Sequence, residues 1–398
     1  MNSKKDNLGS DIGTIRFPET PIFLFDEKQI LKSLNFYKSF QSEIGIKVLY
    51  SIKALPLPFL MKEVIKRLSG FSVSSVFEAR YSREFLREDG VVHFVSPGLI
   101  FHEVDEIREY CNFFTANSFH QLKLIQEGDC KSLSVGIRIH PNISFVSDKR
   151  YDPARRDSKL GVQIDTFMNM LKDDGLSRYN IEGIHIHSNC ESHLALPLSK
   201  IISLILTLPK KFLVTLKWIN LGGGYEFQSM KTLAPLQTAL HVLRESYQVE
   251  VIIEPGQAIV NDAGLLVASV IDIFEKNGEK IAVLDTTVNH LPEVFEYTYR
   301  PEVIGAVKNG LYRYQLAGRS CLAGDLFGIY RFPNPLSIND KIIFKNVGAY
   351  SLVKAHRFNG INLPNIYSLD TDGKLVLRRS FDYSDFKSQW KDSSIENN

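Results

Sequence analysis

Residues 217–225 read KWINLGGGY, an apolar run that ends in three consecutive glycines. Glycine permits a backbone with positive φ and lets another group approach the main chain closely. A glycine-rich turn after a strand is a common phosphate site, because its backbone N–H groups point toward the anion. Taken alone, three glycines in a row more often form a tight surface loop. The rest of the chain has to decide between these two interpretations.

Apolar, β-branched segments like KWIN recur between residues 46 and 256, and turn residues bound each of them. Amphipathic segments such as 57–68 (LPFLMKEVIKRL) and 233–247 (LAPLQTALHVLRESY) separate them. Eight alternations of strand and helix are typical of a (β/α)₈ TIM barrel, an α/β fold. The predicted strands are residues 46–53, 70–75, 92–97, 113–118, 133–141, 181–189, 215–224 and 249–256.

The pattern changes beyond about residue 265, where strand-like segments follow one another without strong helices. Such a pattern predicts an all-β module, a sandwich or barrel, at the C-terminal side. A strand near residues 15–25 is a candidate addition to this module. The predicted organisation is a polar segment at 1–20, a barrel at 21–265, a β domain at 266–390 and a disordered tail at 391–398.

The composition excludes several classes of function. Lys and Arg total 47 against 45 acidic residues, so the net charge of +2 predicts no nucleic-acid partner. Apolar stretches such as AGLLVASVIDIF are shorter than the roughly 20 residues that span a membrane. The N-terminal residues lack the apolar core of a signal peptide. The 4 cysteines form no CxxC pair, so we expect no metal site, no disulfide framework and a cytoplasmic location.

Polar groups stand at the carboxyl ends of the predicted strands, where TIM-barrel enzymes carry their reacting groups. Lys53 ends the first strand, His187 the sixth and Glu254 the eighth, while Gly222–Gly224 end the seventh. Barrel enzymes often bind a phosphate after strand seven. The barrel context therefore favours a phosphate site over a plain surface loop. Other polar residues at predicted strand ends are Ser74, Ser75, Ser96, Asn117, Arg138 and His140.

A lysine and a phosphate site at one end of a barrel predict pyridoxal phosphate as cofactor. Desolvation lowers the pKa of a lysine amine and makes it a nucleophile for the cofactor aldehyde. Glu254 would keep the pyridine nitrogen protonated, and His187 would stack on the ring. The residues alone leave other interpretations open: Lys53 as a surface lysine, Glu254 as a turn-capping acid and His187 as a structural strand residue.

Together these residues resemble the fold-type III pyridoxal phosphate decarboxylases, a group that includes ornithine and diaminopimelate decarboxylases and, more distantly, alanine racemase. The resemblance is strongest to the carboxynorspermidine/carboxyspermidine decarboxylase family and covers roughly residues 20–390. It implies a barrel of the alanine-racemase type with a C-terminal β-sandwich or β-barrel domain. It is carried by TPIFLFD, SIKALPLP, SVSSVFEAR, YDPARRDSKLGV, GIHIHSNCE, WINLGGG, IIEPG, YRPEVIGA, SCLAGD, RFNGINLPNI and FDYSDFKSQW.

The resemblance implies roles for single residues of the barrel. Lys53 would hold the cofactor covalently, and His187 would stack on its ring. Gly222, Gly223 and Gly224 would bind the phosphate, and Glu254 would face the pyridine nitrogen. These assignments agree with the interpretation of the strand ends.

The same resemblance implies a head-to-tail homodimer with two shared sites. Cys321 in SCLAGD would enter from a partner subunit and return a proton after carbon dioxide leaves. Tyr350 would contact the phosphate from the β domain. Asp325 would form an ion pair with Lys159 across the subunits.

The chain departs from the family pattern at residues that the resemblance places near substrate. Where the family has EPGE, this chain has EPGQ, so Gln257 replaces an acid. The family's MPD is LPE here, which contributes Glu293. The family's GPTC is AGRSC here, which places Arg319 beside Cys321. Asp285 is a further residue implied to bind substrate. Loss of a carboxylate and gain of a cation point toward a different or more acidic substrate.

The leading hypothesis is a pyridoxal phosphate-dependent decarboxylase, a carboxy-lyase that forms norspermidine or spermidine from the carboxylated polyamine in polyamine biosynthesis. An alternative keeps the cofactor but acts on diaminopimelate or another specialised amino acid. A catalytically silent binding or regulatory homologue is a third hypothesis, which the retention of Lys53, Glu254, Cys321 and the glycines disfavours. A racemase would place Arg against the pyridine nitrogen, and GGGYEF lacks the third spaced glycine of a dinucleotide site.

Overall fold

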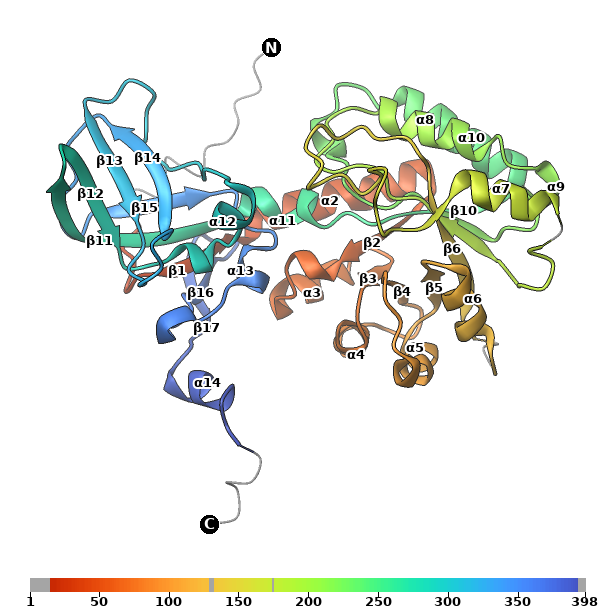
Figure 1. Cartoon of the computed structure of the whole chain (residues 1–398), viewed down its shortest axis with the longest axis horizontal. Helices are drawn as coiled ribbons and strands as arrows, with labels where there is room; N and C mark the ends of the chain where they lie inside the picture. Colours follow the sequence, from red (N-terminus) through yellow and green to blue (C-terminus); the bar gives the residue numbers. More distant parts are fainter. Residues whose placement is uncertain (1–14, 129–131, 174, 393–398) are drawn as a thin grey trace. The chain divides into compact units, whose positions relative to one another are not determined.

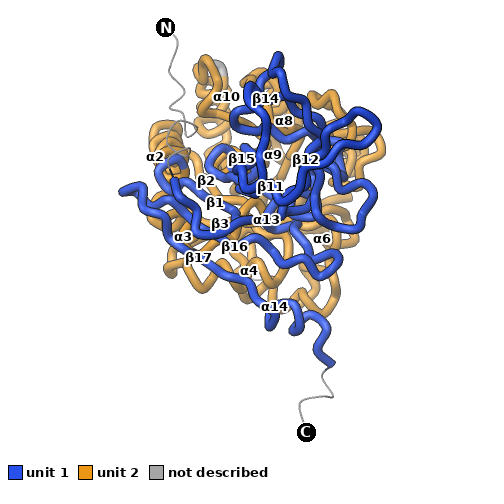
Figure 2. The backbone as a smooth tube through the Cα atoms, turned by 90° about the vertical axis from the view of Figure 1, so that its left-hand side faces the viewer, with its two compact units in different colours: residues 1–29, 261–398 blue, residues 30–260 orange. Residues whose placement is uncertain are grey.

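The computed structural model describes residues 15–128, 132–173 and 175–392. Most of the predicted polar segment at 1–20 and of the predicted tail at 391–398 lies outside the described residues. The chain divides into two compact units (Figure 2). The barrel unit comprises residues 30–260, and the β unit comprises the described residues up to 29 together with those from 261 onward. The boundary therefore falls at 260/261 rather than at 265.

The barrel unit contains a closed ring of parallel strands, and each strand predicted from the sequence between residues 46 and 256 is present. The ring closes because β5 pairs with β6 and β2 pairs with β10. The short strand β7 (Val162–Gln163) extends β6 at its carboxyl end. The ring consists of β2 (Lys47–Ser51), β3 (Gly70–Val73), β4 (Val91–Val95), β5 (Phe113–Ala116), β6 (Ser134–His140), β8 (Gly183–His185), β9 (Trp218–Asn220) and β10 (Glu250–Ile253).

Helices follow the strands and cover the outside of the ring (Figure 1). In α4, the Ser75 side chain caps the N-terminus by accepting the backbone N–H of Glu78. None of the described helices is long and apolar enough to cross a membrane. The helices are α2 (Glu27–Ile44), α3 (Pro58–Val64), α4 (Val76–Arg83), α5 (Val104–Tyr110), α6 (Phe119–Gln126), α7 (Ile164–Lys172), α8 (Leu196–Ile205), α9 (Lys210–Leu213), α10 (Ala234–Tyr247) and α11 (Gln257–Val260).

The amino end of the barrel interior is filled by the indole of Trp218, which is 1% exposed and packs with Leu49, Val91 and Ile252. Two glycines on neighbouring strands make room for this ring. A Cβ at Gly183 would lie 2.0 Å from the indole, and a Cβ at Gly136 would lie 2.4 Å from it. These positions require glycine because real Cβ atoms do not approach other heavy atoms so closely.

The β unit is built on one mixed sheet with the strand order β14-β13-β12-β11-β1-β16-β17, and β15 also pairs with β11. The long strand β11 connects the two halves, because it pairs with β1, β12 and β15. Short helices α12 (Glu293–Tyr297), α13 (Ser351–Lys354) and α14 (Tyr383–Ser388) follow in the same unit. The strands are β1 (Ile22–Asp26), β11 (Gly264–Lys276), β12 (Glu279–Leu284), β13 (Tyr312–Ala317), β14 (Leu326–Phe332), β15 (Lys341–Lys345), β16 (Asn365–Leu369) and β17 (Leu375–Arg379).

Strand β1 belongs to the β unit, although the main sequence division placed residues 21–265 in the barrel. Ile22 pairs with Val267 of β11 on one side and with Asn365 of β16 on the other. The candidate strand near residues 15–25 is therefore part of the β sheet. Two strands that the sequence pattern did not indicate, β14 and β16, complete the sheet.

Candidate active site

Lys53 lies directly after β2, in the short 3₁₀ turn η1 (Ile52–Ala54) at the carboxyl end of the barrel. Gly256 packs against this turn: a Cβ there would lie 3.0 Å from Cβ of Ser51 and 3.1 Å from Cβ of Ala54. Desolvation by surrounding protein lowers the pKa of the Lys53 amine, against the opposing effect of Glu254. Solvent still reaches the side chain, which reduces the size of this effect. A larger share of the amine is therefore neutral and nucleophilic than for a free lysine.

Gly222, Gly223 and Gly224 follow β9 in a turn that tolerates no side chain. Gly222 has φ +68° and Gly224 has φ +83°. A Cβ would lie 2.6 Å from Nδ1 of His187 at Gly222, 2.4 Å from the Glu254 carbonyl oxygen at Gly223, and 2.2 Å from the Asn189 carbonyl oxygen at Gly224. The backbone of all three residues is thus held against neighbouring loops, as a phosphate cradle requires.

Glu254 follows β10 and is 7% exposed in the barrel interior. Its Oε1 accepts a hydrogen bond from Nδ2 of Asn220 at 2.8 Å and lies 3.1 Å from Nδ1 of His93. The Asn220 amide is oriented because its Oδ1 accepts the N–H of Gly222. Burial raises the pKa of a carboxyl, but His93, His185 and Asn220 outweigh burial and hold the pKa of Glu254 well below its usual range. Glu254 is therefore a buried anion at neutral pH.

The second oxygen of Glu254, Oε2, lies 3.7 Å from Nε2 of His185, beyond hydrogen-bond distance. Both ring nitrogens of His185, which is 2% exposed, have no hydrogen-bond partner among the described residues. The same holds for Nη2 of Arg138 and Nδ2 of Asn189, which are also buried. Such groups are normally paired, and a bound ligand with acceptors and a ring nitrogen accounts for this cluster.

His187 follows β8 and accepts the N–H of Gly223 at Nδ1, at 3.0 Å. Burial, Arg138 and Lys53 lower the pKa of His187 to about 3, so the ring is neutral at physiological pH. Lys53, His187 and Glu254 lie within electrostatic range of one another. The structure therefore brings these three sequence-predicted residues and the glycine run together at one end of the barrel. Together with the unpaired buried groups, they fit pyridoxal phosphate by its amine, phosphate and pyridinium requirements.

Gln257, the first residue of α11, lies three residues after Glu254 and donates from Nε2 to Oε1 of Glu191 at 2.6 Å. Glu191 was not predicted from the sequence. His93 and Asn220 were also missed, although each is a polar residue inside an otherwise apolar strand. That position is the signal that points to an inward-facing functional side chain.

Cys321 lies on the loop between β13 and β14 in the β unit, and its side chain is exposed. Asn359 accepts the Cys321 N–H at 2.8 Å. The buried carboxylate of Asp325 closes this loop by accepting the N–H of Val288 at 2.7 Å and both the N–H and the hydroxyl of Ser320, at 2.9 and 2.5 Å. Asp325 thus holds the segment that carries Cys321. Its ion pair with Lys159, an exposed barrel residue, stays a prediction.

Replacing Asp325 with alanine should lower the free energy of unfolding by about 2–4 kcal/mol, because three donors lose a charged acceptor. We also expect faster alkylation of Cys321 by iodoacetamide, since its loop loses a fixed geometry. Urea unfolding and mass-spectrometric alkylation rates measure the two effects. Asp272→Ala, at an exposed position of β11, is the matched control. Equal behaviour of the two variants would contradict this role of Asp325.

The other predicted residues of the β unit have partners inside that unit. Oδ1 of Asp285 accepts the N–H of Ser269 at 2.9 Å, and Oδ2 accepts the hydroxyl of Thr20 at 2.6 Å. Oε1 of Glu293 lies 3.3 Å from Nζ of Lys354. The substrate-binding roles of Asp285 and Glu293 stay predictions.

Two further residues of the β unit stay candidates for the site. Arg319 is exposed beside Cys321 and donates its N–H to the Thr286 carbonyl at 3.0 Å. Tyr350 has φ +66°, which is strained for a bulky residue. Strain of this kind, costing on the order of 1–3 kcal/mol, is concentrated at functional sites. The position of Tyr350 is therefore consistent with a binding role, which stays a prediction.

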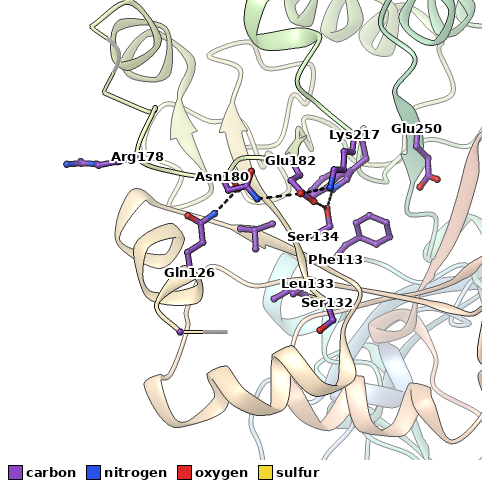
Figure 3. Close-up of a pocket in the computed structure, with 13 residues that line it drawn as sticks. Phe113, Gln126, Ser132, Leu133, Ser134, Arg178, Asn180, Glu182, Lys217 and Glu250 are labelled. Atoms are coloured by element: carbon purple, nitrogen blue, oxygen red, sulfur yellow. Dashed lines mark hydrogen bonds and ion pairs between the residues drawn. The ribbon is translucent and has the colours of Figure 1, made fainter. Parts of the chain in front are cut away.

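A hollow of about 1040 Å³ lies at the opposite, amino end of the barrel strands (Figure 3). Its charged groups pair with each other or with neighbours: Lys217 with Glu182 at 2.5 Å, and Glu250 with Lys47 at 2.7 Å. Ser134 donates to Glu182 at 2.6 Å in the same cluster. Among the residues that the structure describes, this end of the barrel holds no set comparable to Lys53, Glu254 and the glycine turn, so the hollow is not assigned as the active site.

Barrel, glycine cradle, lysine and buried carboxylate define a pyridoxal phosphate-dependent enzyme of the TIM-barrel type. A family model described as "Pyridoxal-dependent decarboxylase, pyridoxal binding domain" matches residues 29–261. The chain belongs to the pyridoxal-dependent decarboxylases, which makes it a carboxy-lyase with pyridoxal phosphate as its cofactor.

Two relatives place the chain within this family. It is 32% identical over 383 residues to a carboxynorspermidine/carboxyspermidine decarboxylase of Campylobacter jejuni, covering 92% of this chain and 97% of the relative. It is equally 32% identical over 379 residues to a carboxyaminopropylagmatine decarboxylase of Synechocystis, covering 93% and 95% of the two chains. Relatives that decarboxylate two different kinds of substrate are therefore equally similar in identity.

Solved structures agree with this placement. The chain is similar to carboxynorspermidine decarboxylase from Campylobacter jejuni complexed with norspermidine, with a TM-score of 0.82 and 31% identity over 93% of this chain and 100% of that one. Diaminopimelate decarboxylase from Methanocaldococcus jannaschii has a TM-score of 0.76 at 22% identity, over 93% and 92% of the two chains. The second likeness shows the shared fold.

Proposed function

We propose that this enzyme decarboxylates an amino acid whose side chain is a long cation: carboxynorspermidine, carboxyspermidine or carboxyaminopropylagmatine. The buried anion of Glu254 carries the decarboxylation: Asn220 and His93 hold one oxygen, and the other lies 3.7 Å from His185. A carboxylate there keeps the pyridine nitrogen protonated, which favours loss of carbon dioxide over the racemase chemistry of an arginine at that place. The similarity to the two groups of relatives supports the cationic side chain.

Each residue of the site then has one task. Pyridoxal phosphate supplies an electron sink for the electron pair left when carbon dioxide departs. Lys53 would hold the cofactor covalently through its amine. Glu254 would keep a proton on the ring nitrogen, neutral His187 would position the ring by stacking, and the side-chain-free turn Gly222–Gly224 would let the phosphate approach the backbone closely. Cys321 returns a proton to the carbon that lost carbon dioxide.

The proposal includes a head-to-tail homodimer, in which Cys321 of one subunit completes the barrel site of the other. Two exposed aromatic side chains that follow barrel strands support it: Phe77, in the first turn of α4 after β3, is 81% exposed, and Phe101, after β4, is 75% exposed. Large exposed apolar groups are typical of interaction surfaces. A cytoplasmic location likewise remains a prediction from the sequence.

Carbon dioxide release by the purified holoenzyme tests the proposal. We expect turnover of at least one of carboxynorspermidine, carboxyspermidine and carboxyaminopropylagmatine, with kcat/KM at least about tenfold above that for meso-diaminopimelate, since a site for a cation rejects a distal carboxylate. The ratio of kcat/KM values is the measurement. Turnover of meso-diaminopimelate alone would replace this proposal with the diaminopimelate alternative, and cofactor binding without any turnover would support a silent homologue.

A further inference from the structure

Gln257 and Glu191 connect two loops at the carboxyl end of the barrel. Nε2 of Gln257 donates to Oε1 of Glu191 at 2.6 Å. Only the NH₂ group of an amide can donate to a carboxylate, so this contact orients the amide. Oε1 of Gln257 and Oε2 of Glu191 are the other acceptors of the pair. The pair presents one negative charge and one neutral carbonyl.

The pair lies between the loops that hold the two ends of the cofactor. Ser192, the residue after Glu191, donates its N–H to the Gly224 carbonyl at 2.9 Å. Gln257 follows Glu254 by three residues. Burial, Glu191 and Glu226 raise the pKa of the Cys190 thiol to about 11 while Lys53 acts in the opposite direction, so Glu191 and Lys53 act on the same neighbour. The pair therefore borders the glycine turn and the end of β10, which the proposed function assigns to the cofactor.

The backbone of Glu191 is strained, with φ +50° in a residue that is not glycine. Its side chain is exposed to solvent, so core packing does not explain the conformation. Strained backbones of this kind persist where the surrounding structure holds a functional side chain in place. Here the hydrogen bond from Gln257 and the backbone bonds of Ser192 hold it.

A glutamate at position 257, as in the EPGE pattern, would place a second carboxylate beside Glu191. Two such charges in contact need a compact cation between them, and an ammonium group fits that need. With Gln257 the pair carries a single charge. A guanidinium is planar and weakly hydrated, and its several N–H groups are satisfied by one carboxylate and an adjacent carbonyl.

We propose that Glu191, held by Gln257, binds the distal cation of the substrate, and that this pair selects a guanidinium end over an ammonium end. The inference deepens the proposed function and rests on it. It assigns the substrate to the class of carboxylated aminopropyl-guanidines, of which carboxyaminopropylagmatine is the test compound.

The first measurement compares kcat/KM of the holoenzyme for carboxyaminopropylagmatine and carboxyspermidine. We expect the guanidinium substrate to be preferred by about tenfold or more. Calorimetric binding of the decarboxylated products, aminopropylagmatine and spermidine, gives a second readout that does not depend on turnover. The same order of affinity is expected there.

Variants of the pair test its role. Glu191→Gln should raise KM for the guanidinium substrate by roughly 10- to 100-fold, the size of a lost charge-assisted hydrogen bond, with kcat within about threefold. Gln257→Glu should shift the preference toward carboxyspermidine by about tenfold. Gln237→Glu adds the same charge on an exposed part of α10 and should change neither. Circular dichroism and the cofactor absorption band confirm that each variant is folded and loaded.

The outcomes distinguish failure of the proposed function from failure of the inference about Glu191 and Gln257. If the wild-type enzyme releases carbon dioxide from neither compound, the proposed function fails and this inference fails with it. If it turns over either compound but prefers carboxyspermidine, or if Gln257→Glu leaves the preference unchanged, the inference alone is overturned. An unchanged KM in Glu191→Gln overturns it as well.

Discussion

Replacing Lys53 with alanine should reduce carbon dioxide release by roughly 1,000-fold or more, since the proposed site contains no second amine that could hold the cofactor covalently. The absorption band of the bound cofactor should be lost on dialysis, while the wild-type protein keeps it. Lys53 lies in the short turn after β2, and the surrounding protein lowers the pKa of its amine. The measurements are the rate of carbon dioxide release and the absorption spectrum after dialysis.

Two controls separate nucleophilicity from charge. Lys53→Arg keeps a positive charge but offers no amine that can lose its proton, so it should be as inactive as Lys53→Ala. Lys62→Ala removes an exposed lysine of α3 and should retain full activity. Substantial turnover by Lys53→Arg would mean that Lys53 acts only through its charge.

Replacing Gly224 with alanine should impair both folding and cofactor binding. The residue has φ +83°, and a Cβ would lie 2.2 Å from the Asn189 carbonyl oxygen. Left-handed strain and displacement of a backbone neighbour together cost about 2–4 kcal/mol. We also expect affinity for pyridoxal phosphate to fall by at least about tenfold, because the cradle must open to relieve the contact.

Gly98→Ala is the matched control, since it lies on another loop at the carboxyl end of the barrel and a Cβ there meets nothing within 4 Å. Urea unfolding of the apoprotein measures the stability term, and fluorescence titration with pyridoxal phosphate measures affinity. A Gly224→Ala protein that matches Gly98→Ala in both assays would show that these glycines form an ordinary loop, the other interpretation of KWINLGGGY.

The barrel could be predicted from the sequence because its signal is local. Each parallel strand is covered on both sides and reads as a short apolar run, so the ring strands were identified from the chain alone. The β unit was harder because its pairings are not local. Strand β1 lies between β11 and β16, over two hundred residues away, and β14 contains Gly328, which weakens its strand pattern.

The candidate site shows the same limit. Lys53 and Glu254 could be predicted because they end apolar strands. His93 is a single polar residue within the apolar strand β4, and Asn220 ends β9 just before the glycine run, so neither was singled out from the sequence. The contact between Gln257 and Glu191 joins residues 66 positions apart, and no sequence pattern in either segment predicts it. The role of Asp325 in holding its loop could not be predicted from the sequence either, since its hydrogen-bond partners come from two separate segments.

The indole of Trp218 restricts the order in which the barrel can change during evolution. Gly183 cannot acquire a side chain while the ring occupies its space, so a substitution there is tolerated only after Trp218 has been replaced by something smaller. Gly136 is restricted further, because a Cβ there would also lie 2.5 Å from the Gly183 carbonyl oxygen. The ring also packs edge-on against His93, with centroids 5.2 Å apart, and His93 contacts Glu254. Substitutions at the amino end of the barrel are therefore coupled, through Trp218 and His93, to the surroundings of the Glu254 carboxylate at the carboxyl end.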